Sequence, residues 1–184
     1  MIPFRKQREA IGRFLLKRKL KKQRRDVKMK PLSGISSAAI FFDASSEACR
    51  KESKALGKKL IANHVKVRSL GLFNSKNPEL NFISDKNLYF ATLKDFSFFF
   101  LPKSEEVTTF ASETPDMLFI YSSQPSFPAQ AVVEMSRPSL RVGFAHLWNN
   151  ALDLTFEIHD LNPRELTKQI ERYLDNMHVS EESN

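Results

Sequence analysis

The run Ser37-Ala-Ala-Ile-Phe-Phe-Asp43 is short, apolar and bounded by polar residues, which predicts a strand buried on both faces. Ser45 and Ser46 follow it and can cap a helix, which the pattern predicts over residues 47–63. A second apolar strand is predicted at 65–73. Because strands that alternate with helices form parallel sheets, this stretch predicts an α/β fold.

The alternation continues to the end of the chain. Further strands are expected at 88–90, 116–121, 140–144 and 154–158, and further helices at 104–112, 128–135 and from residue 163 onward. The last helix has Asn162 as its N-cap, Pro163 at its first position and Glu165 completing a capping box. We therefore expect a single Rossmann-like three-layer domain over 35–179, with an open, mostly parallel sheet, and a polar tail at 180–184.

Most of the positive charge lies in front of this domain. Residues 1–30 hold 13 of the 29 Lys and Arg but only two of the 21 acids, a net charge of +11, whereas residues 31–184 carry −3. On a helical wheel Phe4, Ile11 and Leu15 share one face, and beyond Leu15 the helix is basic all round. Because such a helix is not expected to lie on a protein core, we predict a basic helical arm at 1–30. Its first half is expected to pack on the body or on a partner protein.

A basic arm of this kind suits insertion between phosphate strands, so we expect a non-catalytic RNA-binding protein. The expected partners are ribosomal RNA and ribosomal proteins. The arm residues expected to neutralise phosphates are Arg5, Arg8, Arg13, Lys17, Arg18, Lys19, Lys21, Lys22, Arg24 and Arg25. The exposed side of the helix at 47–63 adds a second patch of Arg50, Lys51, Lys54 and Lys58.

Three alternatives stay open. In the first, the arm is a disordered solubilising tail. In the second, its first turns lie on anionic lipid through Phe4, Ile11 and Leu15. In the third, the chain is an enzyme that binds a sugar or nucleotide at the strand ends, where Asp43, Asn74 and Ser122 are expected.

The sequence shows little that points to catalysis. The turn after the first strand has no glycine and carries two carboxylates, which argues against a dinucleotide site, and we expect Asp43 to bond local amides. The four histidines and Cys49 lack metal-ligand spacing, so neither a cofactor nor a metal is expected. A single cysteine fits a reducing compartment, and we expect a cytoplasmic location. No apolar run approaches the length that spans a bilayer.

Aromatic residues are the remaining candidates for contacts. Phe96, Phe98, Phe99 and Phe100 form either core or a base-stacking platform, and core is the expected role. Trp148 lies between two strands and is expected either as a contact residue on an exposed loop or as a lid on the sheet.

Three stretches carry a family resemblance: 95–107, 115–121 and 141–144. They resemble a small family of unknown function from Bacteroidota, which implies a basic N-terminal helix followed by a compact α/β domain and brings no catalytic residues. The segment 116–144 is also similar to the acceptor half of heptosyltransferase-like glycosyltransferases. Those enzymes bind their nucleotide-sugar with a second Rossmann domain, for which this chain has no room, so that similarity implies the fold and not the activity.

Overall fold

The computed structural model describes residues 4–78, 82–148 and 150–181, with the side chains of the last helix described as far as Asn176. Within them the strands form one all-parallel sheet in the order β3-β2-β1-β4-β5-β6. The strands are β1 (Ser37–Asp43), β2 (Lys66–Leu72), β3 (Leu88–Ala91), β4 (Met117–Tyr121), β5 (Leu140–Phe144) and β6 (Leu154–Phe156). The predicted α/β fold is confirmed, and the order is that of a doubly wound dinucleotide-binding sheet.

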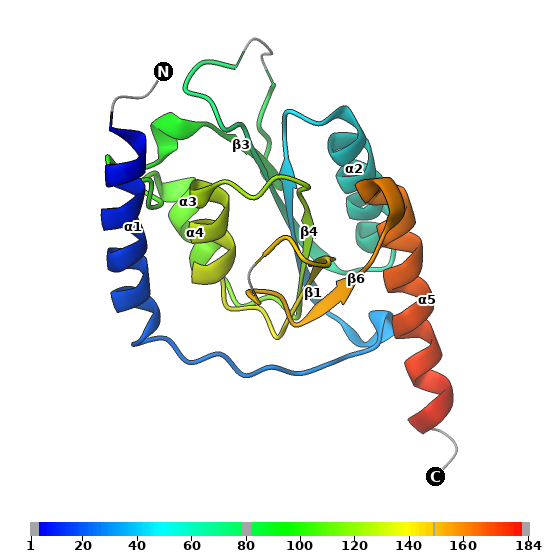
Figure 1. Ribbon diagram of the computed structural model, residues 1–184. Helices are drawn as coiled ribbons and strands as arrows, with labels where there is room; N and C mark the ends of the chain where they lie inside the picture. The colour runs from blue at the N-terminus through cyan, green and yellow to red at the C-terminus, as the bar shows by residue number, and fades with distance from the viewer. Residues whose placement is uncertain (1–3, 79–81, 149, 182–184) are drawn as a thin grey trace.

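Helices cover both faces of this sheet. Figure 1 shows α2 (Glu47–Ala62) and α5 (Pro163–Glu181) on one face and α3 (Glu105–Ser112) and α4 (Phe127–Met135) on the other. Alternate residues of β1 enter the two cores: Ile40 belongs to the cluster under α2 and α5, and Phe41 to the cluster under α3 and α4. Because both faces are buried, the central strands are continuously apolar.

The predicted caps Ser46 and Asn162 are confirmed, whereas the carboxylate of Glu165, which was expected to complete a capping box, pairs with Lys168 at 3.1 Å. Ser46 Oγ accepts a hydrogen bond from Cys49 N, which begins α2, and Asn162 Oδ1 accepts one from Arg164 N at the start of α5. The apolar repeat of α5 predicts a core-facing stripe, which is confirmed for Leu166, Ile170 and Leu174, whereas Tyr173 of the same stripe is 45% exposed. Met177 and His178 lie outside the described side chains.

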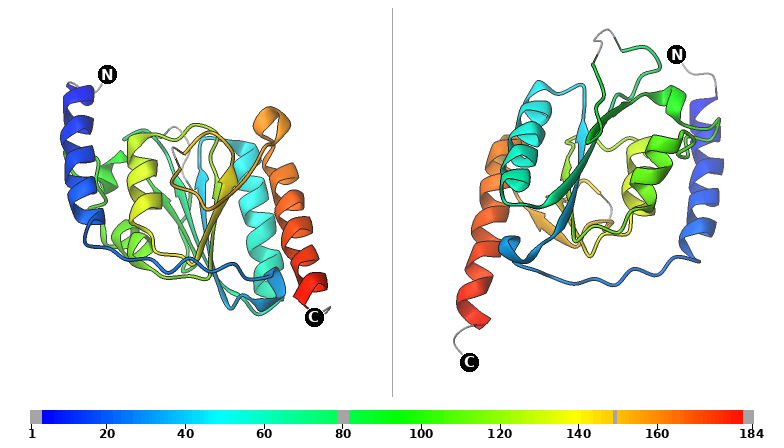
Figure 2. Two further views of the ribbon diagram at one scale, coloured as in Figure 1. Left: turned by 60° about the horizontal axis from the view of Figure 1, so that its bottom comes forward. Right: turned by 180° about the vertical axis from the view of Figure 1, so that it is seen from behind.

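The first helix, α1 (Arg5–Leu20), lies on the domain. It forms a further layer outside α3 and α4 in all views (Figures 1 and 2) and contacts α4. The expected packing of the first half of the arm on the body is confirmed, whereas the part beyond Leu15 is not basic all round, because Leu16 is buried and Leu20 packs against the core. Gly12 has no side chain, so the backbone of α1 closely approaches Phe99 and Phe127, and Leu16, 3% exposed, completes the buried face.

An extended strap, residues 21–31, leads from α1 back to the sheet. It runs below the N-terminal ends of the strands (Figures 1 and 2) and turns into β1 through a 3-10 turn at Leu32–Gly34. Lys28 N donates to Ser139 O at 3.1 Å, and Lys30 Nζ lies 2.6 Å from Asp116 Oδ1. These two contacts of the strap and the packing of α1 therefore hold residues 4–30 on the domain.

The aromatic candidates are mostly core. Trp148 is 3% exposed and packs edge-on against Phe41, with ring centroids 6.4 Å apart, so it is a lid on the sheet and not a residue of an exposed loop. Phe96 and Phe100 are buried, as predicted, whereas Phe98 is 64% exposed.

Candidate nucleic-acid interface

The structure divides the predicted arm residues into two groups, of which the first contacts the domain. Arg5 Nε pairs with Glu9 Oε1 at 2.8 Å, and its Nη2 donates to Asn74 Oδ1 at 3.3 Å. Arg8 Nε donates to Phe98 O at 2.7 Å while the guanidinium lies 3.9 Å from the centre of the Phe98 ring. Arg8 therefore holds the N-terminal half of α1 on the 96–100 loop, and Arg5 joins it to Asn74.

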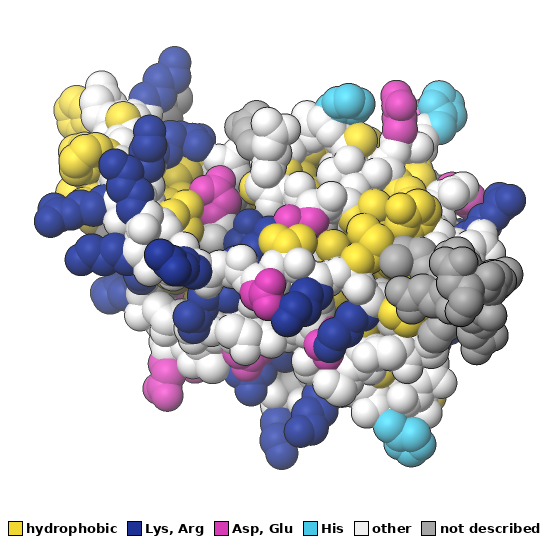
Figure 3. Space-filling view, turned by 90° about the horizontal axis from the view of Figure 1, so that it is seen from below, with side chains coloured by type: hydrophobic (Ala, Val, Ile, Leu, Met, Phe, Trp, Pro, Cys, Tyr) yellow, Lys and Arg dark blue, Asp and Glu magenta, His cyan; other side chains and the backbone are white. Residues whose placement is uncertain are grey.

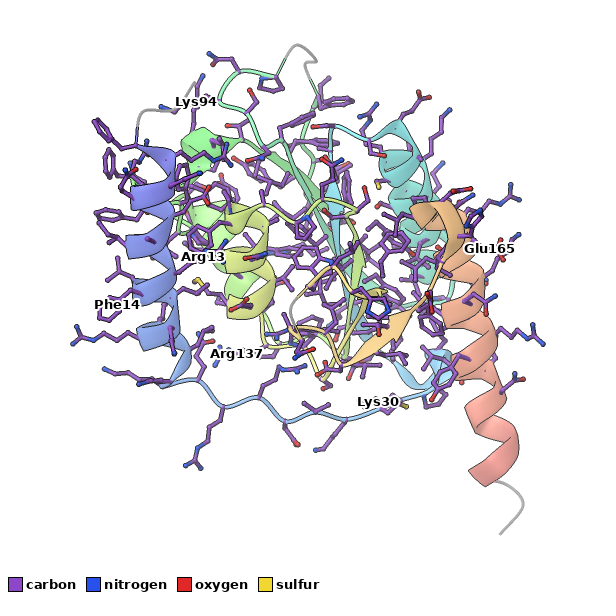
Figure 4. All side chains as sticks on the ribbon, viewed as in Figure 1. Arg13, Phe14, Lys30, Lys94, Arg137 and Glu165 are labelled. Carbon is purple, nitrogen blue, oxygen red and sulfur yellow. The ribbon has the colours of Figure 1, made fainter. Side chains whose placement is uncertain are left out.

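Arg13 and Arg25 extend this anchoring. Arg13 Nη1 donates to Gln130 Oε1 at 2.8 Å and stacks over the Phe127 ring, pointing from α1 toward α4 (Figure 4). Arg25 forms a two-pronged ion pair with Asp153, with Nη1 2.6 Å from Oδ2. A planar guanidinium suits both geometries, so these arginines stabilise the docked position of α1 and the strap.

The second group of arm residues faces solvent. Its members are exposed, and none has a hydrogen bond or ion pair from its side chain within the described residues: Lys17, Arg18, Lys19, Lys21, Lys22 and Arg24. We call them the basic cluster. They lie at the C-terminal end of α1, where the helix dipole favours cations, and at the start of the strap. Seen from below, Lys and Arg gather over this end of the molecule (Figure 3).

A groove of about 340 Å³ lies beside the basic cluster, with Leu20 and Gln23 on one side and Arg137 and Arg141 on the other. Arg141 is buried, and its Nη2 donates to Glu134 O and Ser136 O at the C-terminal end of α4. Burial, reinforced by the charge of neighbouring Arg25, lowers the pKa of Arg141 to about 10. Arg141 is therefore a structural cap for α4.

Arg137 is the residue here that the sequence interpretation missed. Its Nη2 donates to Ser112 O at 3.1 Å, which caps α3, while the side chain remains exposed beside Leu20 of α1. Figure 4 shows it beside the lower end of α1, on the side toward the domain. It lies more than a hundred residues after the arm in sequence, so only the fold brings it to the basic cluster.

The predicted second patch lies elsewhere. Arg50, Lys51, Lys54 and Lys58 are on α2, on the opposite face of the sheet from α1 (Figure 1). The structure therefore does not bring the two predicted patches together, and a single flat surface cannot contact both.

The strand-end residues are engaged within the protein. Asp43 Oδ1 accepts from Ser45 N at 2.8 Å, which confirms its predicted local role. Asn74 contacts Arg5, and Ser122 is buried. Cys49 is buried as well, and burial raises the pKa of its thiol. Among the described residues, no group of three or more His, Cys, Asp or Glu side chains is placed to hold a metal ion.

Among known protein families, the model of a family of unknown function, DUF6913, matches residues 8–177. The chain belongs to this family. The DUF6913 match begins within α1 and ends within α5, so it includes the docked helix as well as the sheet. The expected resemblance to an uncharacterised family is thereby confirmed at the level of that family.

Neither the curated proteins nor the solved structures contain a match to the chain. In the part of the chain that the structure describes, none of the helices combines the length and the apolar character needed to cross a bilayer.

Proposed function

We propose that this chain is a non-catalytic RNA-binding protein that docks on structured RNA, ribosomal RNA above all, through the basic cluster. The observation that supports the proposal is the contrast within one segment. Its arginines at positions 5, 8, 13 and 25 contact the domain, whereas the six cations of the basic cluster are exposed and lack partners among the described residues. Because the backbone that carries these cations is already held on the domain, less backbone freedom is lost when their side chains meet phosphates.

The docked position of α1 changes the expected mode of binding. Because one side of the helix is covered by α4 and the 96–100 loop, RNA reaches it from the outer side only. We therefore propose docking against a phosphate surface rather than insertion between phosphate strands. Arg137 extends this surface across the groove. Ribosomal proteins beside the RNA site and a cytoplasmic location belong to the same proposal.

The experiment compares two double variants that change the net charge equally. Lys21→Glu/Lys22→Glu removes part of the basic cluster, and Lys54→Glu/Lys58→Glu makes the same charge change on the other face. Binding to a fragment of ribosomal RNA is measured over a range of salt concentrations. If about six cations contact phosphates, the slope of log affinity against log salt is roughly −4 to −5.

The first variant is expected to flatten this slope by about two, and the second to leave it unchanged. Equal losses in both variants, or a wild-type slope near zero, contradict the proposal.

A second candidate function is attachment to an anionic membrane surface. The outward side of α1 exposes Phe4, Ile11 and Phe14, which are 76%, 47% and 67% exposed, and Phe14 lies one helical turn before the basic cluster. Phe14 points away from the domain (Figure 4). Binding to anionic vesicles that is lost in Phe14→Ser, while RNA binding by the same variant is unchanged, favours this function.

A further inference from the structure

A groove of about 530 Å³ runs along α2 on the face of the sheet opposite to α1. One wall is α2, the other is the segment 82–88, and the floor includes Val67, Leu88 and Phe90. α2 packs on β1 and β2, and α5 packs on β5 and β6. The sheet surface toward its β3 edge is therefore left open.

Each wall of the groove carries one exposed isoleucine. Ile61 on α2 is 50% exposed, and Ile83 on the opposite wall is 90% exposed. Exposed isoleucines on both walls of an apolar floor are typical of a surface that another molecule covers.

A row of lysines follows the α2 wall. Lys51, Lys54 and Lys58 are three and four residues apart, which corresponds to about 4.5 and 6 Å along the helix axis. Lys54 and Lys58 are exposed and lack side-chain partners among the described residues, and Lys51 forms only an exposed pair with Glu47. On the far wall, the Asp85 carboxylate accepts from two backbone amides. The lysines thus form a row of positive charges along the α2 wall of the groove.

Two kinds of occupant are disfavoured by the groove itself. A strand cannot readily add to β3, because Ser84 Oγ accepts from Phe90 N and Asp85 N donates to Leu88 O. A nucleic-acid base finds no open aromatic platform, because the Phe82 ring stacks on Phe90 at 4.8 Å and carries the Arg50 guanidinium over it at 5.0 Å.

We propose that this groove binds an acidic amphipathic helix of a partner protein. The apolar stripe of the partner covers the floor together with Ile61 and Ile83. Its carboxylates, spaced one helical turn apart, pair with Lys51, Lys54 and Lys58, whose spacing matches that repeat. This interface lies on the other side of the sheet from the basic cluster and does not depend on RNA binding.

The test uses the full chain and a labelled synthetic peptide of about 15 residues, with leucines on one helical face and glutamates on the others. The control peptide has the same composition in a scrambled order, so that its leucines share no face. Fluorescence anisotropy is measured at about 0.15 M salt, where distant surface charges are screened. The amphipathic peptide is expected to bind at least about tenfold more tightly than the scrambled one.

Two double variants locate the site. Lys54→Glu/Lys58→Glu and Ile61→Ser/Ile83→Ser are each expected to weaken binding by about tenfold or more, and both change exposed side chains. Lys21→Glu/Lys22→Glu, on the other face, is expected to leave it unchanged.

The proposal is overturned if neither peptide binds, if both bind equally, or if the groove variants bind like the wild type. It is also overturned if oligouridylate competes with the peptide and the groove variants lose oligouridylate binding, because the groove then binds nucleic acid. Loss of RNA binding only in Lys21→Glu/Lys22→Glu concerns the proposed function and leaves this result intact.

Discussion

Replacing Gly12 by alanine tests whether α1 is held on the domain by close backbone contact. A Cβ at position 12 would lie 2.2 Å from Phe99 O and 2.5 Å from Phe127 Cε1, so α1 must move outward by about 1 Å to restore an ordinary contact. That movement loosens the burial of Leu16 and lengthens the 2.7 Å hydrogen bond from Arg8 to Phe98 O.

The expected change in the free energy of unfolding follows from two opposing effects. In a helix without such contacts, Gly→Ala stabilises by up to about 1 kcal/mol, whereas overpacking a tight contact costs about 1–3 kcal/mol. With the weaker packing of Leu16 added, we expect a net loss of about 1–2 kcal/mol.

Gly57 in α2 is the matched control. A Cβ there would meet Ile40 Cδ1 at 3.7 Å, an ordinary contact, so Gly57→Ala is expected to stabilise by about 0.5–1 kcal/mol. Urea unfolding measures both free energies, and trypsin cleavage within the basic cluster reports whether α1 leaves the domain locally. If Gly12→Ala stabilises the protein as much as Gly57→Ala does, the close docking of α1 is refuted.

Three further outcomes are expected. Deleting residues 1–20 should lower the free energy of unfolding by about 2–5 kcal/mol through the loss of Leu16 packing alone, and urea unfolding that matches the full chain would contradict this. Arg8→Lys keeps the charge but loses the bond to Phe98 O and much of the ring contact, so faster hydrogen exchange in α1 is expected, with Lys6→Ala, an exposed change, as the control. Partial burial would raise the pKa of Asp116, but hydrogen bonds from Lys30 and Ser36 outweigh it and hold that pKa well below its usual value. The stability it contributes is therefore present above about pH 4 and lost as the pH falls, and unfolding free energies measured across that range should decline less in Asp116→Asn.

The sheet and its helices were predictable because their signals are local. Ser46 and Asn162 are caps that act within three residues, and an apolar run such as 37–43 needs burial on both faces wherever it lies. The register of strands, by contrast, is decided by contacts between distant segments. Even so, the alternation of strands and helices was enough to predict a parallel sheet.

The position of α1 was not predictable in the same way. Hydrophobic patterning assigns Phe4, Ile11 and Leu15 to the buried face, yet Phe4 and Ile11 are exposed and the helix packs through Gly12 and Leu16. A glycine gives no apolar signal, because its contribution is the closeness of the backbone that it permits. The role of Gly12 becomes evident only in the folded structure, where Phe99 and Phe127 form the surface that the helix backbone approaches.

The contacts of α1 also impose an order on biosynthesis. Arg8 and Arg13 bond to residues that lie 90 and 117 positions later in the chain. At about 5–20 residues per second, the ribosome produces this docking surface roughly 5–20 s after α1 itself. During that interval the most basic segment of the protein lacks the surface on which it docks. It is then close to the RNA of the ribosome that synthesises it. Although α1 precedes the whole sheet in the chain, it is therefore among the last of these elements to be packed.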